Sequence, residues 1–216
     1  MAATVSQAPR LTAAGKAGSL NIWVQCKNDP VEVDMQTVPS IPVVDIFAGP
    51  GGLGEGFSAY GQQGTGIHRP FRIAVSAEKE AWAWRTLRLR AFFRQFAPDE
   101  VPSSYYDYIR GEGHFPYTDA TLRQWKIAGE EARQLKLGDP DDDLVLDSLV
   151  RQVAGLDRPW VLIGGPPCQA YSLAGRVRNL GVPGYVAEKD RRHFLYEHYL
   201  QLVAKYRPAV FVMENV

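Results

Sequence analysis

Short apolar runs alternate with longer stretches of helical character through most of the chain. Four runs rich in β-branched residues predict buried strands of a parallel sheet, at residues 41–47, 71–77, 160–164 and 209–213. The stretches between them predict helices at residues 53–60, 79–96, 147–154 and 191–206. Strands that alternate with helices are typical of an open, doubly wound α/β fold with a mostly parallel, Rossmann-like sheet.

Two segments interrupt this alternation. Residues 1–40 are small and polar apart from one apolar patch at 21–25, and they predict an arm or a weak strand. Residues 97–132 carry prolines and glycines that break any long element, together with many aromatic side chains. These rings could stack on bases, but we expect them to pack onto the domain surface. The sequence therefore predicts an amino-terminal arm followed by one domain over residues 41–216, with an insertion near 97–132.

Bulk composition is that of an ordinary globular protein. The chain has 216 residues, 45% of them hydrophobic and 22% charged, which is enough for one domain with a real core. No apolar run approaches the roughly 20 residues of a membrane-spanning helix, and the first residues lack the apolar core of a secretory signal. We therefore expect a cytoplasmic protein. Two distant cysteines and four histidines without ligand spacing argue against a disulfide framework and a structural metal.

Charge does not decide whether the partner is a nucleic acid. The 24 basic residues balance 24 acidic ones, so there is no net positive field. Arginines cluster at positions 85, 88, 90 and 94, at 176 and 178, and at 191 and 192. Each cluster could contact phosphates or could form a solvated helix face.

A glycine-rich loop follows the first predicted strand of the domain. Residues 49–54 (GPGGLG) fit the pattern G-x-G-x-x-G between a strand and a helix, where the backbone can approach a ligand closely. Glu78 ends the second strand, where a carboxylate can accept both hydroxyls of a ribose. Asp139 follows a short strand candidate at 135–138, where it could accept from an adenine amino group. Either acid could instead be a solvent-facing loop residue.

Cys168 is the strongest candidate for covalent chemistry. It comes directly after Pro166 and Pro167, just past the carboxyl end of the 160–164 strand, where open α/β sheets bind ligands. A cysteine is most often a small buried hydrophobe, but this rigid turn is suited to aiming a side chain into a cleft. An ionised thiol there is a nucleophile. The two motifs together predict cofactor-dependent covalent chemistry.

Taken together, these motifs resemble the DNA (cytosine-5)-methyltransferases, which use S-adenosylmethionine. Residues 45–52 (DIFAGPGG) resemble the cofactor loop, and PPCQ at 166–169 with Ser172 resembles the nucleophile motif, with Tyr171 where phenylalanine is usual. Residues 190–195 (DRRHFL) and 214–216 (ENV) resemble two further motifs, in the family's order. The resemblance implies that the cofactor is bound by Asp45, Phe47, Ala48, Gly49, Gly51, Gly52, Leu53, Glu78, Asp139 and Pro166.

The resemblance also implies a mechanism. The Cys168 thiolate adds to C6 of cytosine, protonated Glu214 hydrogen-bonds the N3 edge, and the activated ring takes the methyl group at C5. The target base must leave the duplex, and residues 170–184 could form a loop that closes over it. Substrate contacts are expected from Gln169, Ser172, Arg176 and Asn215, and no metal is expected.

The family pattern continues past Val216 with an arginine-bearing segment, a target-recognition region and a final stretch that returns to the cofactor. We therefore expect a sheet incomplete at its carboxyl end and a chain that is weakly stable and inactive alone, with a second chain as one source of the missing motifs. An RNA cytosine-5 methyltransferase and a non-catalytic binding remnant are the alternatives. A nicotinamide oxidoreductase explains the glycine loop but not Pro-Pro-Cys. The location would be cytoplasmic in a bacterial or phage setting and nuclear in a eukaryote.

Overall fold

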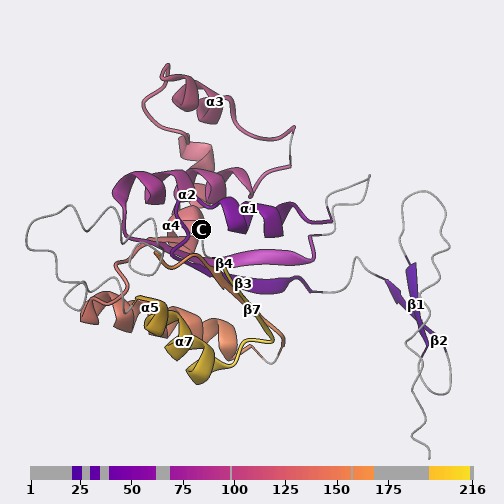
Figure 1. Cartoon of the computed structure of the whole chain (residues 1–216). Helices are drawn as coiled ribbons and strands as arrows, with labels where there is room; N and C mark the ends of the chain where they lie inside the picture. Colours follow the sequence, from indigo (N-terminus) through magenta and orange to yellow (C-terminus); the bar gives the residue numbers. More distant parts are fainter. Residues whose placement is uncertain are drawn as a thin grey trace, which may run out of the picture.

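Among the described residues, five parallel strands form the central sheet (Figure 1). The computed structural model describes residues 21–25, 30–34, 39–61, 69–97, 99–156, 158–167 and 195–214. From edge to edge the strands are β5 (Ala132–Gln134), β4 (Phe71–Glu78), β3 (Ile41–Ile46), β6 (Val161–Gly164) and β7 (Val210–Met213). The chain builds outward from β3 in one direction and then from β6 in the other, so the predicted doubly wound α/β fold is confirmed.

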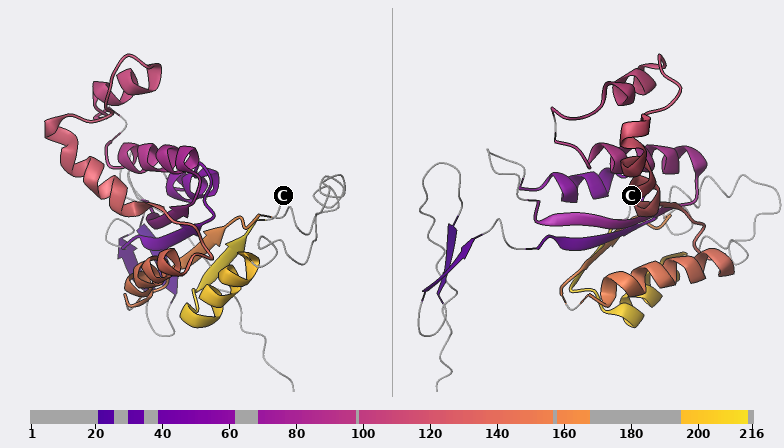
Figure 2. Two further views of the ribbon diagram at one scale, coloured as in Figure 1. Left: turned by 90° about the vertical axis from the view of Figure 1, so that its left-hand side faces the viewer. Right: turned by 180° about the vertical axis from the view of Figure 1, so that it is seen from behind.

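Helices cover both faces of this sheet (Figure 2). On one face lie α1 (Gly52–Ala59), α2 (Ala81–Phe93) and α4 (Leu122–Glu131), and on the other lie α5 (Pro140–Ala154) and α7 (Leu195–Tyr206). The short helices α3 (Ser103–Arg110) and η1 (Asp119–Thr121) belong to the connection between α2 and α4. Within the described ranges, none of the helices has both the length and the apolar character needed to cross a membrane.

Outside the central sheet, the apolar patch at residues 21–25 is a strand. It is β1 (Asn21–Gln25), and it pairs antiparallel with β2 (Pro30–Asp34).

Successive side chains of each strand point to opposite faces of the sheet, and both faces are apolar. Val44 and Ile46 of β3 pack with Leu146 and Val150 of α5, whereas Val43 belongs to the cluster on the α1 face. Tyr199 of α7 is fully buried, and its hydroxyl lies 3.1 and 3.0 Å from the carbonyl oxygens of Leu162 and Val212. These contacts hold α7 against β6 and β7. The strand β7 is an edge of the sheet, and it exposes half of the side chains of Val210 and Phe211.

The segment near 97–132 is helical, which the sequence did not predict. Its prolines and glycines stand at helix ends, with Pro102 as the N-cap of α3 and Gly111 as its left-handed C-cap. Tyr105 is buried against Phe92, and Tyr117 stacks on Trp125 at 5.3 Å. The expected packing is therefore confirmed for these two rings, whereas other aromatic side chains of the segment remain exposed, namely Tyr106 and Phe115.

Two predicted elements were misplaced by three residues or more at their start. The third strand is residues 132–134 rather than 135–138, because Leu135 and Leu137 are buried in the turn after the strand and only imitate strand alternation. Helix α5 begins at Pro140 rather than at residue 147, with Asp139 as its N-cap. An aspartate followed by proline and a run of acids is a recognisable helix start.

Candidate active site

The carboxyl ends of the parallel strands bring the described candidate residues to one edge of the sheet. The backbone N–H of Ala48, after β3, donates to the carbonyl of Ala77 in β4 at 3.1 Å. On the other side of the strand-order reversal, the N–H of Glu214 after β7 donates to the carbonyl of Gly164 in β6 at 2.9 Å. The reversal lies between β3 and β6, which is where doubly wound sheets bind ligands.

The glycine loop has the backbone conformation that its sequence predicts. Gly49 and Gly51 have positive φ angles of 55° and 91°, and Phe47 has one of 54°. A Cβ on Gly51 would lie 2.7 Å from Leu87, so α2 packs directly against the loop. A Cβ on Gly49 or Gly52 would meet no atom of the described residues within 4 Å. The loop is therefore braced on one side and open on the other, as a ligand cradle requires.

Glu78 is fixed beside this loop. Its Oε2 accepts the N–H of Gly49 at 2.9 Å, and its Oε1 accepts the N–H of Glu80 at 2.8 Å. The side chain is almost fully buried, so its interpretation as a solvent-facing loop residue is wrong. Each carboxylate oxygen has two acceptor positions, which leaves capacity for a pair of ligand hydroxyls.

Asp45 is buried at the end of β3, next to Gly54 of α1. It is 1% exposed, and neither carboxylate oxygen has a hydrogen-bond partner within the described part of the chain. Its Oδ2 is so close to Gly54 that a Cβ there would lie 2.9 Å from it. Burial raises the pKa of Asp45 to about 7, although the Gly54 amide and Arg94 oppose the increase.

Three of the clustered arginines serve the interior of the fold. Arg90 donates to the carbonyl of Gly51 at 3.3 Å, and Arg94 pairs with Glu55 of α1 and Glu131 of α4. Arg88 lies 4.0 Å from the ring centre of Trp125. The two predicted roles of this cluster, contact with phosphates and a solvated helix face, therefore do not describe these three side chains. Leu87 and Arg90, which brace the glycine loop, were missed because their role depends on how α2 docks.

The β6 end approaches its neighbours very closely. A Cβ on Gly164 would lie 2.2 Å from the carbonyl oxygen of Ile46, and a Cβ on Gly165 would lie 3.0 Å from Oε2 of Glu214. The Glu214 side chain therefore lies beside the backbone that leads into buried Pro166. The remaining candidates fall outside the described residues, namely Cys168, Gln169, Ser172, Arg176 and Asn215.

Gly164→Ala is expected to destabilise the protein by about 1–3 kcal/mol, because the added methyl group meets a backbone oxygen that cannot rotate away. Thermal or urea unfolding measures the loss. Gly56→Ala in α1 is the matched control, since within the part of the chain that the structure describes its Cβ would meet nothing within 4 Å. That variant should gain up to about 1 kcal/mol from lower unfolded-state entropy. Equal stability of the two variants would contradict the close approach of β6 to β3.

Asp139 is the N-cap of α5. Its Oδ1 accepts the N–H of Asp141 at 3.3 Å, so it is a helix cap rather than a free loop acid. Gly138 before it has a φ of 91° and donates its N–H to Asp143 at 3.0 Å. Capping uses one acceptor position, and the carboxylate retains others for a ligand amino group.

Across the described ranges, no group of three or more His, Cys, Asp or Glu side chains is arranged to hold a metal ion.

Known proteins share much of this sequence. A model of the family described as C-5 cytosine-specific DNA methylase matches residues 150–216. The chain is 30% identical over 191 residues to the type II methyltransferase M.Bpa9945I of Bacillus paralicheniformis, which is 81% of this chain and 40% of that protein. It is 27% identical over 177 residues to the type II methyltransferase M1.HphI of Haemophilus parahaemolyticus, covering 82% of this chain and 32% of that protein. The chain thus spans two fifths or less of these relatives' lengths.

Proposed function

Because the chain belongs to the DNA (cytosine-5)-methyltransferase family, we propose that it transfers a methyl group from S-adenosylmethionine to C5 of cytosine in DNA. The observation that carries this proposal is the placement of the open glycine loop, Glu78 and Glu214 along one edge of the sheet. The edge includes the strand-order reversal, and the peptide that leads to Cys168 leaves it from β6.

The described residues fit the cofactor. The open backbone at Gly49 and Gly52 gives room for close approach, and Glu78 has acceptor capacity for the ribose hydroxyls. Asp139 would accept from the adenine amino group, while Phe47, Ala48, Gly51, Leu53 and Pro166 would complete the walls. Asp45 would support the loop through its close approach to Gly54. When bound, the cofactor supplies an electrophilic methyl group on a sulfonium.

Cys168 and Glu214 would activate the cytosine ring. The Cys168 thiolate forms a bond to C6, and Glu214 in its protonated form donates to N3 and stabilises the negative charge that develops there. The C5 carbon then takes the methyl group, which leaves S-adenosylhomocysteine as the second product. Water accepts the C5 proton, and departure of the thiolate restores the aromatic ring. The position of Glu214 beside Gly165 supports this pairing of roles.

The substrate would be duplex DNA with one cytosine flipped out of the stack. Gln169, Ser172, Arg176 and Asn215 are the proposed substrate contacts. Choice of the DNA sequence would rest on parts corresponding to the rest of the longer relatives, supplied by the same polypeptide or by a second chain.

A methyl-transfer assay with labelled S-adenosylmethionine tests this function in protein isolated from its own cells. We expect label in duplex DNA and its recovery as 5-methylcytosine, with none in tRNA. Label in tRNA alone would favour the RNA methyltransferase. Cofactor binding with no transfer to either would favour the non-catalytic remnant.

Glu78→Gln is expected to weaken cofactor binding by about 10- to 100-fold. The amide has one acceptor oxygen where the carboxylate has two, so one backbone N–H beside the loop loses its partner and the ribose loses an acceptor. Calorimetry with S-adenosylhomocysteine measures the change. Glu112→Gln, on an exposed side chain in the insertion, is the control and should bind as wild type. Unchanged affinity in Glu78→Gln would remove Glu78 from the site.

A further inference from the structure

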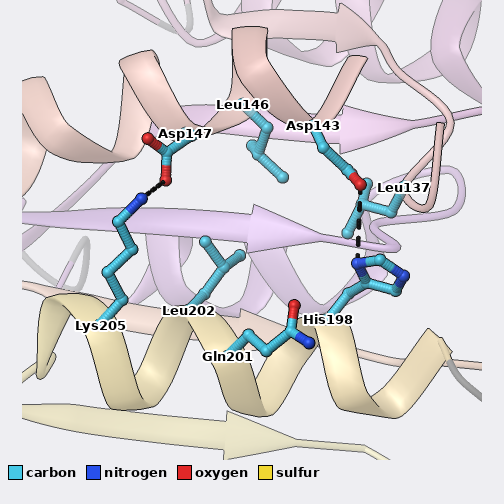
Figure 3. A pocket seen from close by; sticks show the side chains of 8 residues that line it. All are labelled: Leu137, Asp143, Leu146, Asp147, His198, Gln201, Leu202 and Lys205. Carbon is cyan, nitrogen blue, oxygen red and sulfur yellow. Dashed lines mark hydrogen bonds and ion pairs between the residues drawn. The ribbon is translucent and has the colours of Figure 1, made fainter. Parts of the chain in front are cut away.

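Helices α5 and α7 face each other across a cavity of about 150 Å³ (Figure 3). Its apolar lining is Leu137, Leu146 and Leu202. Two polar pairs span the same seam, one toward each end of the cavity, as Figure 3 shows. They are His198 with Asp143 and Lys205 with Asp147.

The two pairs have different neighbours. His198 Nδ1 lies 3.6 Å from Oδ2 of Asp143, and the other oxygen of Asp143 accepts the N–H of Gly138 at 3.0 Å. A Cβ on Gly138 would lie 3.3 Å from Nε2 of His198, so the imidazole also packs against this turn directly. Lys205, by contrast, reaches Asp147 one helical turn further along α5. Of these two pairs, the histidine pair is the one that contacts the turn between β5 and α5 among the described residues.

Apolar packing and polar contacts together join the two helices beside this cavity. Leu137 and Leu146 are buried in the core cluster, and Leu202 packs against that cluster. At the His198 end, the imidazole and the Asp143 carboxylate, which accepts the N–H of Gly138, add polar contacts to the turn. In the same turn the Asp142 carboxylate accepts the N–H of Lys136 at 2.9 Å. The residue after Gly138 is Asp139, the cap of α5.

We propose that His198 is a positioning residue for the adenine end of the cofactor site, where it fixes the turn that presents Asp139. The inference rests on the proposed function, in which Asp139 accepts from the adenine amino group. It assigns to α7 a role in cofactor recognition that acts through Asp143 and Gly138. A small displacement of the turn would misplace the acceptor for that one amino group and leave the contacts at Glu78 intact.

Two ligands separate positioning from general stability. S-adenosylhomocysteine carries the 6-amino group, and its inosine analogue carries an oxygen there and cannot donate to Asp139. In the complete protein, His198→Ala should weaken S-adenosylhomocysteine about tenfold and the analogue less than about twofold, as measured by calorimetry. His198→Gln keeps a side-chain N–H donor and should recover part of the loss.

Lys205→Met is the matched control. It removes the other polar pair from the same two helices and the same cavity, at a distance from Gly138, and should bind both ligands as wild type does. Equal weakening of both ligands by His198→Ala, or wild-type affinity for both, would overturn the inference and leave the proposed function standing. If wild-type protein bound neither ligand, the proposed function would fail and the inference with it.

Discussion

Cys168→Ser is expected to abolish methyl transfer to DNA, with a loss on the order of 10⁴-fold or more. The serine hydroxyl is nearly isosteric with the thiol, but it ionises far less readily at neutral pH and is a much poorer nucleophile toward C6. The proposed cofactor cradle lies after β3 and β4, on residues that the substitution does not change. Binding of S-adenosylhomocysteine should therefore stay within about twofold of wild type.

Cys26→Ser is the control for Cys168→Ser, because Cys26 is the other cysteine of the chain and belongs to no motif of the site. It should transfer methyl groups at the wild-type rate. Normal turnover by Cys168→Ser would rule out the covalent mechanism, and loss of cofactor binding in that variant would mean that the substitution disturbs the fold instead.

The free energy of unfolding of wild type, minus that of Asp45→Asn, should fall by about 4 kcal/mol as the pH rises from 4 to 8. Burial raises the pKa of Asp45 from 3.8 to about 7 in the folded chain. Between these values the folded state holds a proton that the unfolded state has released, so unfolding becomes easier as the pH rises. The asparagine side chain does not titrate and has no such dependence. Urea unfolding of both proteins at several pH values measures the difference.

Asp147→Asn is the matched carboxylate control. Although its partial burial acts in the opposite direction, hydrogen bonds from Lys205 and Tyr206 lower the pKa of Asp147. Ionised Asp147 stabilises the folded state above the pKa of the unfolded chain, and this stabilisation is lost only in more acidic solution. The free energy of unfolding of wild type, minus that of Asp147→Asn, should therefore not fall between pH 4 and pH 8. If the difference in the free energy of unfolding between wild type and Asp45→Asn did not change with pH, Asp45 would be solvated or paired in solution.

The sequence predicted those features that depend on local pattern. The β-branched runs became β3, β4, β6 and β7 because buried parallel strands are apolar on both faces. The glycine loop could be placed because its positive φ angles require such residues. Glu78 followed from its position at the end of a strand, where the structure shows it beside the loop.

Other features depend on tertiary contacts and gave no local signal. Arg90 braces the glycine loop and Arg94 joins α1 to α4, but in the sequence they cannot be told from a solvated cluster. The helices of the insertion were missed because Pro102 and Gly111 read as breakers, although one caps the start of α3 and the other its end. The burial of Asp45 without a hydrogen-bond partner among the described residues follows from the docking of α1 over β3.

Covalent capture of a modified substrate shows directly whether Cys168 is the nucleophile. Duplex DNA in which the target cytosine carries fluorine at C5 is mixed with the protein and S-adenosylmethionine, and the product is analysed by denaturing mass spectrometry. Fluorine cannot leave as the C5 proton does, so the Sγ–C6 bond should persist after methyl transfer, and a methylated DNA adduct should map to Cys168. A protein that methylates ordinary cytosine but forms no adduct, or forms one at another residue, would contradict the assignment of Cys168 as the nucleophile.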